Sequence, residues 1–234
     1  MNTDSEQIQL SESASKHICK VLRMKPGQSI EVFDGKGRAV TATLDTIERK
    51  LTTVTITELF ILSPRPTITT HLGQVLSKGD RMDYAIQKAI ELGVSEITPL
   101  FSDRCDIKLN EDRAQKKLLH WQNIVISACE QCKQNYLPKV NPAMSLASWS
   151  DNLEADLKCM FHTKNASTFA NIATSKPNSI AIVVGPEGGF TEEEVNGLLS
   201  KDFVTVSLGP RILRTETAPV VALSLIQQLW GDFH

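Results

Sequence analysis

The segment IAIVVGPEGGF, residues 180–190, joins a short apolar run to a turn rich in glycine and proline. A second segment, FVTVSLGPRILRTE at residues 203–216, has the same order of features. Short apolar runs bounded by such turn residues are typical of buried strands, and glycine brings bare backbone to the surface. If both strands belong to one open α/β sheet, loops 184–190 and 208–216 form a cleft at the edge where such sheets bind ligands.

The second part of the chain alternates predicted strands with predicted helices. We expect further strands at 69–76, 96–101 and 159–162. We expect helices at 81–92, 110–132, 145–149, 165–174, 192–199 and 216–230. The predicted helix caps are the turn 77–80, Asn110 and Ser145, and Gly93 is a predicted helix end. This alternation predicts an α/β fold whose mostly parallel sheet is covered by helices on both faces.

Residues 1–66 have the pattern of a small β domain. Strands are expected at 29–33, 40–44 and 51–57, with a hairpin turn at 34–37. A short helical stretch at 15–24 is expected to place Ile18, Val21 and Leu22 on one face. Its lysines and arginine fit two interpretations equally well. They form a basic patch on a small β-barrel, or they are the solvated face of an ordinary helix. Two prolines within residues 63–66 predict a stiff connection between domains 1–66 and 67–234.

The composition is that of an ordinary globular protein, with 41% hydrophobic and 22% charged residues. The formal charge of −2 indicates no global basic field, although a local basic patch is enough to bind RNA. No apolar run approaches the roughly 20 residues that span a bilayer, and residues 1–10 lack a secretory signal. The five scattered cysteines indicate reduced thiols. We therefore expect a cytoplasmic protein with no membrane partner.

The first loop has neither common phosphate-binding fingerprint. Thr191 and Glu194 predict a capping box, and residues 192–194 put three carboxylates at the positive end of the next helix. A phosphate there would meet like charges. A ligand of this loop should therefore lack phosphate, as S-adenosylmethionine does. Taken alone, however, the composition of the loop favours a plain glycine turn before a well-capped helix.

The second loop carries three charged residues among apolar ones: Arg211, Arg214 and Glu216. Arg214 and Glu216 pair structurally, or else Arg214 holds an RNA phosphate or the target base. His162, at a predicted strand end, is a weaker candidate for the cleft. Cys129 and Cys132 have redox-motif spacing, but they lie within a predicted helix with no second pair, which favours buried thiols over a metal or redox site. No metal is expected.

In combination, the two loops resemble those of the SPOUT-class methyltransferases of the RsmE type, which make N3-methyluridine in 16S ribosomal RNA. The matching stretches are residues 185–190 and 208–218, supported by 17–27, 73–100 and 128–131. The resemblance covers nearly the whole chain. It implies a PUA-like RNA-binding β-barrel at residues 1–66 and a SPOUT methyltransferase domain with a deep trefoil knot at 67–234.

The resemblance also implies the ligands, partners and site residues. The substrate is 16S ribosomal RNA or the small ribosomal subunit, and the chain forms a homodimer with the cofactor beside the interface. S-adenosylmethionine is held by Val184, Gly185, Pro186, Glu187, Gly188, Gly189, Leu208, Gly209, Pro210, Ile212 and Leu213. Arg214 and Glu216 are the catalytic candidates. RNA is bound by Lys16, Lys20, Arg23, Lys25 and Arg211.

The chain departs from the family pattern at three places. It lacks the first strand with an arginine and an aromatic residue, which is expected to remove an RNA contact. Gln134 stands where the family has arginine, which moves a substrate contact to Lys133, and Pro219 replaces a small residue. Two alternatives to a methyltransferase stay open: an RNA-binding or assembly protein without turnover, and an α/β enzyme that uses another nucleotide.

Overall fold

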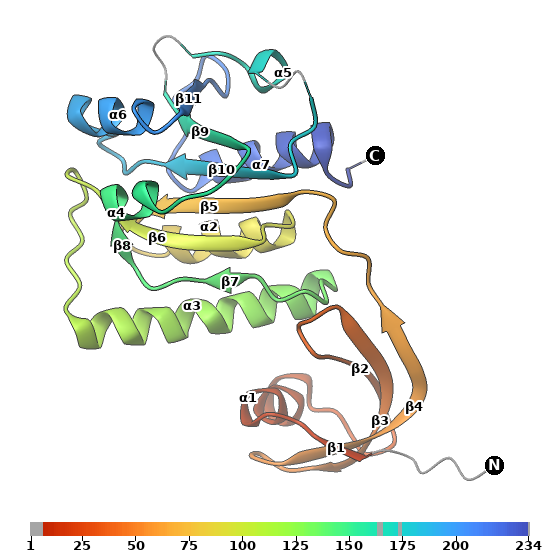
Figure 1. Cartoon of the computed structure of the whole chain (residues 1–234). Helices are drawn as coiled ribbons and strands as arrows, with labels where there is room; N and C mark the ends of the chain where they lie inside the picture. The colour runs from red at the N-terminus through yellow and green to blue at the C-terminus, as the bar shows by residue number, and fades with distance from the viewer. Residues whose placement is uncertain (1–6, 163–165, 173–174, 234) are drawn as a thin grey trace. The chain divides into compact units, whose positions relative to one another are not determined.

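The chain forms two compact units, residues 1–65 and 66–234, in a computed structural model that describes residues 7–162, 166–172 and 175–233 (Figure 1). The division between the units falls within the proline-containing segment 63–66. Among the described residues, no helix combines the length and the apolar character that a bilayer span requires.

The N-terminal unit is a small antiparallel sheet with one helical segment. Its elements are β1 (Gln7–Gln9), α1 (Glu12–Lys16), η1 (His17–Leu22), β2 (Ser29–Phe33), β3 (Arg38–Ile47) and β4 (Thr52–Leu62). The strands pair antiparallel in the order β1-β4-β3-β2. The hairpin at 34–37 is closed by Asp34, whose carboxylate accepts the backbone N–H of Lys36 at 2.7 Å. Strands β3 and β4 are longer than predicted.

The helical segment of this unit differs from its prediction. Ile18 packs into the small core of the unit and is 6% exposed, whereas Val21 and Leu22 are 67% and 54% exposed. The prediction of one shared face was therefore wrong. η1 is a π-helix, whose hydrogen bonds run from residue i to i+5. Its wider turn moves Val21 off the face of Ile18, and Leu22 is the last residue of the segment. The segment ends at Arg23, which adopts a left-handed conformation.

The C-terminal unit is a parallel sheet with helices on both faces. Its strands are β5 (Thr69–Val75), β6 (Glu96–Phe101), β7 (Lys139–Val140), β8 (Met144–Ser145), β9 (Leu157–Phe161), β10 (Ser179–Val184) and β11 (Phe203–Val206). Its helices are α2 (Arg81–Glu91), α3 (Glu111–Cys132), α4 (Leu146–Asp151), α5 (Phe169–Ile172), α6 (Glu192–Leu199) and α7 (Thr217–Trp230). The strand order is β11-β9-β10-β5-β6-β7, with β8 also paired to β6, and each of these pairs is parallel. The α/β fold class is confirmed, and the trefoil knot stays a prediction.

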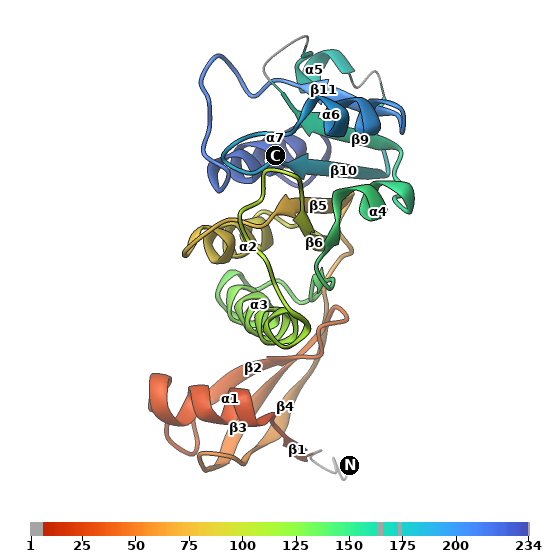
Figure 2. The same cartoon turned by 90° about the vertical axis from the view of Figure 1, so that its left-hand side faces the viewer.

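Apolar stripes attach the helices to the sheet. Helices α2 and α7 lie on one face with α3 beyond α2, and α4 and α6 lie on the other face (Figure 2). Helix α2 buries one side of its first three turns: Met82, Ala85, Ile86, Ala89 and Ile90. Since the strands are parallel, their carboxyl ends meet at one edge of the sheet, and the loops that follow β5, β6, β10 and β11 all start there.

The predicted helix ends are mostly present. Asn110 caps α3 and Ser145 caps α4, each accepting a backbone N–H from the first turn. Asp80 occupies the cap position of α2, but its side chain accepts no such bond, so that predicted cap is wrong. Its backbone does not adopt the extended conformation that is typical of N-cap residues. Helix α5 is shorter than the predicted 165–174, and residues 165, 173 and 174 lie outside the described residues.

Candidate active site

Loops 184–190 and 208–216 line one cavity of about 640 Å³. The first follows β10 and the second follows β11, with β9 between the two strands. The cavity is of the size that binds small molecules and cofactors. The structure therefore has a cavity at the edge of the sheet where the two loops were expected to meet.

Most of the predicted site residues belong to the wall of this cavity. These are Val184, Gly185, Pro186, Glu187, Gly188, Gly189, Leu208, Gly209, Arg211, Ile212, Leu213, Arg214 and Glu216. Pro210 lies in the same loop but is not part of the wall. His162 also lines the cavity. Because loop 184–190 presents glycine and backbone rather than bulky side chains, a ligand can approach its main chain closely.

A single hydroxyl joins the two loops. Thr215 donates its hydroxyl hydrogen to the carbonyl oxygen of Gly185 at 2.9 Å. The Nε2 amide of Gln74, at the end of β5, donates to the hydroxyl oxygen of Thr215 at 3.0 Å. Gln74 and Thr215 are both buried. This chain of hydrogen bonds connects both loops to a strand in the middle of the sheet, and sequence reasoning did not identify either residue.

Two arginines contact the first loop. Arg81, the first residue of α2, forms an ion pair with Glu187. Arg104, which follows β6, donates from Nη1 to the carbonyl oxygen of Gly188 at 2.8 Å. The ion pair compensates the charge of Glu187 at the cavity wall. The sequence analysis did not identify either arginine. Each follows a strand whose carboxyl end lies at the ligand-binding edge of the sheet, and this position is a signal that could have identified them.

The predicted capping box after the first loop is present. The backbone N–H of Thr191 donates to the Glu194 carboxylate at 2.8 Å, and the Glu194 N–H donates to the Thr191 hydroxyl at 3.2 Å. The Glu194 carboxylate also accepts the N–H of Asp103 at 2.8 Å. The positive end of α6 is therefore already neutralised by protein groups, which disfavours a phosphate at this position.

The charged residues of the second loop differ sharply in exposure. The side chain of Arg214 is 79% exposed, whereas that of Glu216 is 15% exposed. Their nearest charged atoms are 4.0 Å apart, which is too long for a hydrogen bond. The ion pair is therefore loose, and the Arg214 guanidinium is available at the rim of the cavity.

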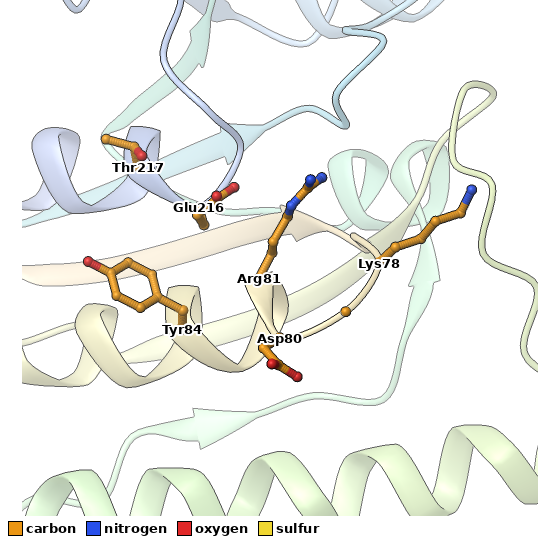
Figure 3. A pocket seen from close by; sticks show the side chains of 7 residues that line it. Lys78, Asp80, Arg81, Tyr84, Glu216 and Thr217 are labelled. Carbon is orange, nitrogen blue, oxygen red and sulfur yellow. The ribbon is translucent and has the colours of Figure 1, made fainter.

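A second, more open cavity of about 710 Å³ adjoins the first. Its wall contains Lys78, Asp80, Tyr84 and Thr217 from the start of α2 and of α7 (Figure 3). Arg81 and Glu216 line both cavities, so the two spaces share a wall. The second cavity was not predicted, because its two sides come from helices more than a hundred residues apart in sequence.

The remaining candidates lie elsewhere. Lys16, Lys20, Arg23 and Lys25 are exposed on the N-terminal unit. Lys133 is the left-handed residue that ends α3, and Gln134 donates its amide to the carbonyl oxygen of Tyr136 at 3.1 Å.

The cysteines are free thiols in the described part of the chain. Burial raises the pKa of the Cys129 thiol to about 12, which opposes the thiolate needed for metal or redox chemistry. Within residues 7–162, 166–172 and 175–233, no cluster of three histidine, cysteine or acidic side chains could hold a metal ion.

Comparison with known families gives two matches. Residues 63–227 match the model of a family described as RNA methyltransferase domain. Residues 10–57 match a model described as RNA methyltransferase PUA domain. The two matches follow one another along the chain and fall mainly within different structural units.

Individual proteins resemble the chain over nearly its full length. Ribosomal RNA small subunit methyltransferase E of Buchnera aphidicola is 37% identical over 229 residues, covering 97% of this chain and 93% of that protein. A putative methyltransferase of Legionella pneumophila with bound S-adenosylmethionine superposes with a TM-score of 0.94 at 36% identity, covering 100% and 96% of the two chains. A ribosomal RNA small subunit methyltransferase E of Neisseria gonorrhoeae bound to S-adenosylmethionine gives 0.90 at 38% identity, with the same coverage.

Proposed function

The chain belongs to the ribosomal RNA small subunit methyltransferase E family, and on that premise we propose that it methylates N3 of one uridine in 16S ribosomal RNA. S-adenosylmethionine is the proposed methyl donor. The observation that carries this proposal is the cavity between the two loops, which the Thr215 hydroxyl joins to each other. The chain also closely resembles two structures in which this donor is bound. A substrate of this kind is found in the cytoplasm, which is the proposed location.

The cavity fits this donor better than it fits a phosphate-bearing nucleotide. The start of α6 is neutralised by Glu194, which disfavours a phosphate at that position. Arg81 compensates the charge of Glu187, and the Glu216 carboxylate in the wall tolerates a sulfonium cation. The backbone of residues 184–189 and 208–213 would hold the donor, which supplies an electrophilic methyl group when bound.

The protein contributes mainly position and charge. The loops must hold the methyl group in line with the attacking nitrogen, which is a contribution of proximity and orientation. Arg214, which lines the cavity, would stabilise negative charge that develops on a uracil oxygen. Lys16, Lys20, Arg23 and Lys25 of the N-terminal unit, together with Arg211, would bind RNA phosphates and so position the substrate without reading its sequence.

The function is tested by methyl transfer to ribosomal RNA. Small subunits and naked 16S RNA from cells that lack N3-methyluridine are incubated with the purified chain and labelled S-adenosylmethionine. We expect incorporation at a single uridine, which mass spectrometry of nuclease fragments locates. Tight RNA binding without incorporation would instead favour the RNA-binding protein without turnover.

Cofactor titration tests the remaining alternative, an α/β enzyme that uses another nucleotide. Calorimetry with S-adenosylmethionine, NAD and ATP is expected to give saturable binding for S-adenosylmethionine and no comparable binding for the other two. The reason is the neutralised helix start, which offers a phosphate no free positive end. Tight binding of NAD or ATP would contradict both this argument and the proposed donor.

We further propose that two copies of the chain associate through α7. The sequence of this helix, TAPVVALSLIQQLW, contains no charged residue, yet Leu225 and Leu229 are exposed one turn apart. Tyr84 on the neighbouring helix α2 and Phe233 beyond the end of α7 are also exposed. An uncharged helix with an apolar outer face is typical of a homodimer interface.

Sedimentation tests this association. The wild-type chain is expected to sediment at twice its mass of 25.9 kDa. The double variant Leu225→Glu/Leu229→Glu is expected to sediment as a monomer, because association would bury the two carboxylates introduced in each chain. Leu119→Glu is the matched control, since Leu119 is exposed on α3 away from this face. A double variant that remains dimeric would exclude this surface.

A further inference from the structure

We propose that Glu216 is the base that removes the N3 proton of the target uridine, an inference that rests on the proposed function and names its missing catalytic group. The carboxylate lies in the wall shared by the two cavities, close to Arg214. Three properties of this side chain support the assignment. It has no capping role, it has a buried oxygen without a partner, and its chemistry complements that of uracil.

Glu216 stands at the cap position of α7 but does not serve as a cap. Its side chain accepts no hydrogen bond from the first turn. The N–H groups of Thr217 and Ala218 both donate to the carbonyl oxygen of Arg214, at 2.9 and 3.0 Å. The third residue of the helix, Pro219, has no N–H to donate. The start of α7 therefore leaves the Glu216 carboxylate free for another role.

The carboxylate is also left incompletely hydrogen-bonded. The Glu216 side chain is 15% exposed, and its Oε2 atom is buried without a hydrogen-bond donor among the described residues. The nearest charged group, Nη1 of Arg214, is 4.0 Å from Oε1. An unsatisfied buried acceptor lowers stability, and such groups persist at sites where a ligand supplies the donor. The partner of Glu216 is thus expected to be a donor on a molecule that enters the cavity.

The N3–H group of uracil is such a donor. It lies between two carbonyl oxygens, so the same edge of the base can donate to Glu216 and accept from the guanidinium of Arg214. Cytosine has no hydrogen at N3, and its nitrogen lone pair would face the carboxylate. Glu216 would therefore also favour uridine over cytidine, since a buried polar group left unpaired discriminates strongly against the wrong substrate.

The proposed step balances charge and atoms. The N3 proton moves to the carboxylate of Glu216, and the N3 electron pair forms the bond to the methyl carbon. The carbon–sulfur bond breaks, and its electron pair remains on sulfur as a neutral thioether. The reactants carry one negative charge on Glu216 and one positive charge on sulfur, and the products are neutral. Glu216 then loses its proton to water through the more open second cavity.

The variant Glu216→Gln tests this assignment, because glutamine keeps the size of the side chain and removes its basicity. Single-turnover methyl transfer with saturating S-adenosylmethionine is expected to fall by about a hundredfold or more. The dissociation constant of S-adenosylmethionine is expected to stay within about twofold of wild type, because a general base acts in the chemical step and not in cofactor binding. The matched control, Glu192→Gln, changes an exposed carboxylate in the first turn of α6 and is expected to leave both quantities unchanged.

The pH profile separates a base from a structural residue. Without Glu216, hydroxide must remove the N3 proton, so the rate of Glu216→Gln is expected to rise about tenfold per pH unit. The wild-type rate is expected to rise less steeply over the same range. RNA that contains 5-fluorouridine, whose N3–H is more acidic, should restore the variant more than it accelerates wild type.

Several outcomes would overturn the assignment. A variant with the wild-type rate and pH profile would exclude a base at this position, and equal losses of rate and cofactor affinity would make Glu216 a cofactor ligand instead. If Glu216→Gln does not fold, Glu216→Asp retains the carboxylate, and its pH profile must then match wild type at a lower rate. A wild-type chain that transfers no methyl group to any RNA would overturn the proposed function, and this assignment with it.

Discussion

Replacing Arg214 by alanine is expected to lower the rate of methyl transfer by about a hundredfold or more, which is the usual cost of removing one preorganised donor. Its affinity for S-adenosylmethionine should change little. The guanidinium is largely exposed at the rim of the cavity and makes only a loose contact with Glu216. The structural contribution of the residue comes from its carbonyl oxygen, which accepts two N–H groups at the start of α7. Alanine keeps that carbonyl, so the loop should hold its shape.

The test measures rate and binding on the same preparation. Single-turnover methyl transfer reports the chemical step, and calorimetry reports the dissociation constant of S-adenosylmethionine. Arg211→Ala is the comparison, because Arg211 lies three positions earlier in the same loop and we propose that it binds RNA phosphate. It is expected to raise the RNA concentration needed for half-maximal rate and to leave the saturating rate within a few-fold of wild type. Equal losses of rate and cofactor affinity in Arg214→Ala would show that the side chain is structural.

Replacing Thr215 by valine is expected to weaken both the fold and the cofactor site. Valine has nearly the same shape but lacks the hydroxyl, so the bonds from Gln74 and to Gly185 are both lost. The Oε1 atom of Gln74 already lacks a partner among the described residues. Leaving buried polar groups unpaired costs about 1–3 kcal/mol, and the two loops lose the bond that joins them.

Urea unfolding and calorimetry measure the two effects. We expect a lower free energy of unfolding and an affinity for S-adenosylmethionine that is weaker by about 5- to 150-fold, the equivalent of the same 1–3 kcal/mol. Thr215→Ser keeps the hydroxyl and is expected to retain most of the affinity. Wild-type affinity in Thr215→Val would mean that the loops are held together by packing alone.

Local sequence patterns were sufficient for most of the secondary structure. Strands β10 and β11, the buried stripe of α2, the caps Asn110 and Ser145 and the capping box at Thr191 were predicted correctly. Each depends on residues a few positions apart, whose interactions follow from chain geometry. The error at Val21 arose because an α-helical period was applied to a segment that forms a π-helix, whereas Leu22 is exposed at the end of that segment.

Only the tertiary structure shows which residues hold the cavity wall together. Loops 184–190 and 208–216 could be found in the sequence because their glycines and prolines mark turns. The residues that organise them could not, since Gln74 and Thr215 are 141 positions apart, and Arg81 and Glu187 are 106 apart. No local pattern encodes such pairs, because parallel strands bring distant segments to one edge of the sheet. Glu216 was already a catalytic candidate from the sequence, but its buried oxygen without a partner among the described residues depends on the tertiary packing around it.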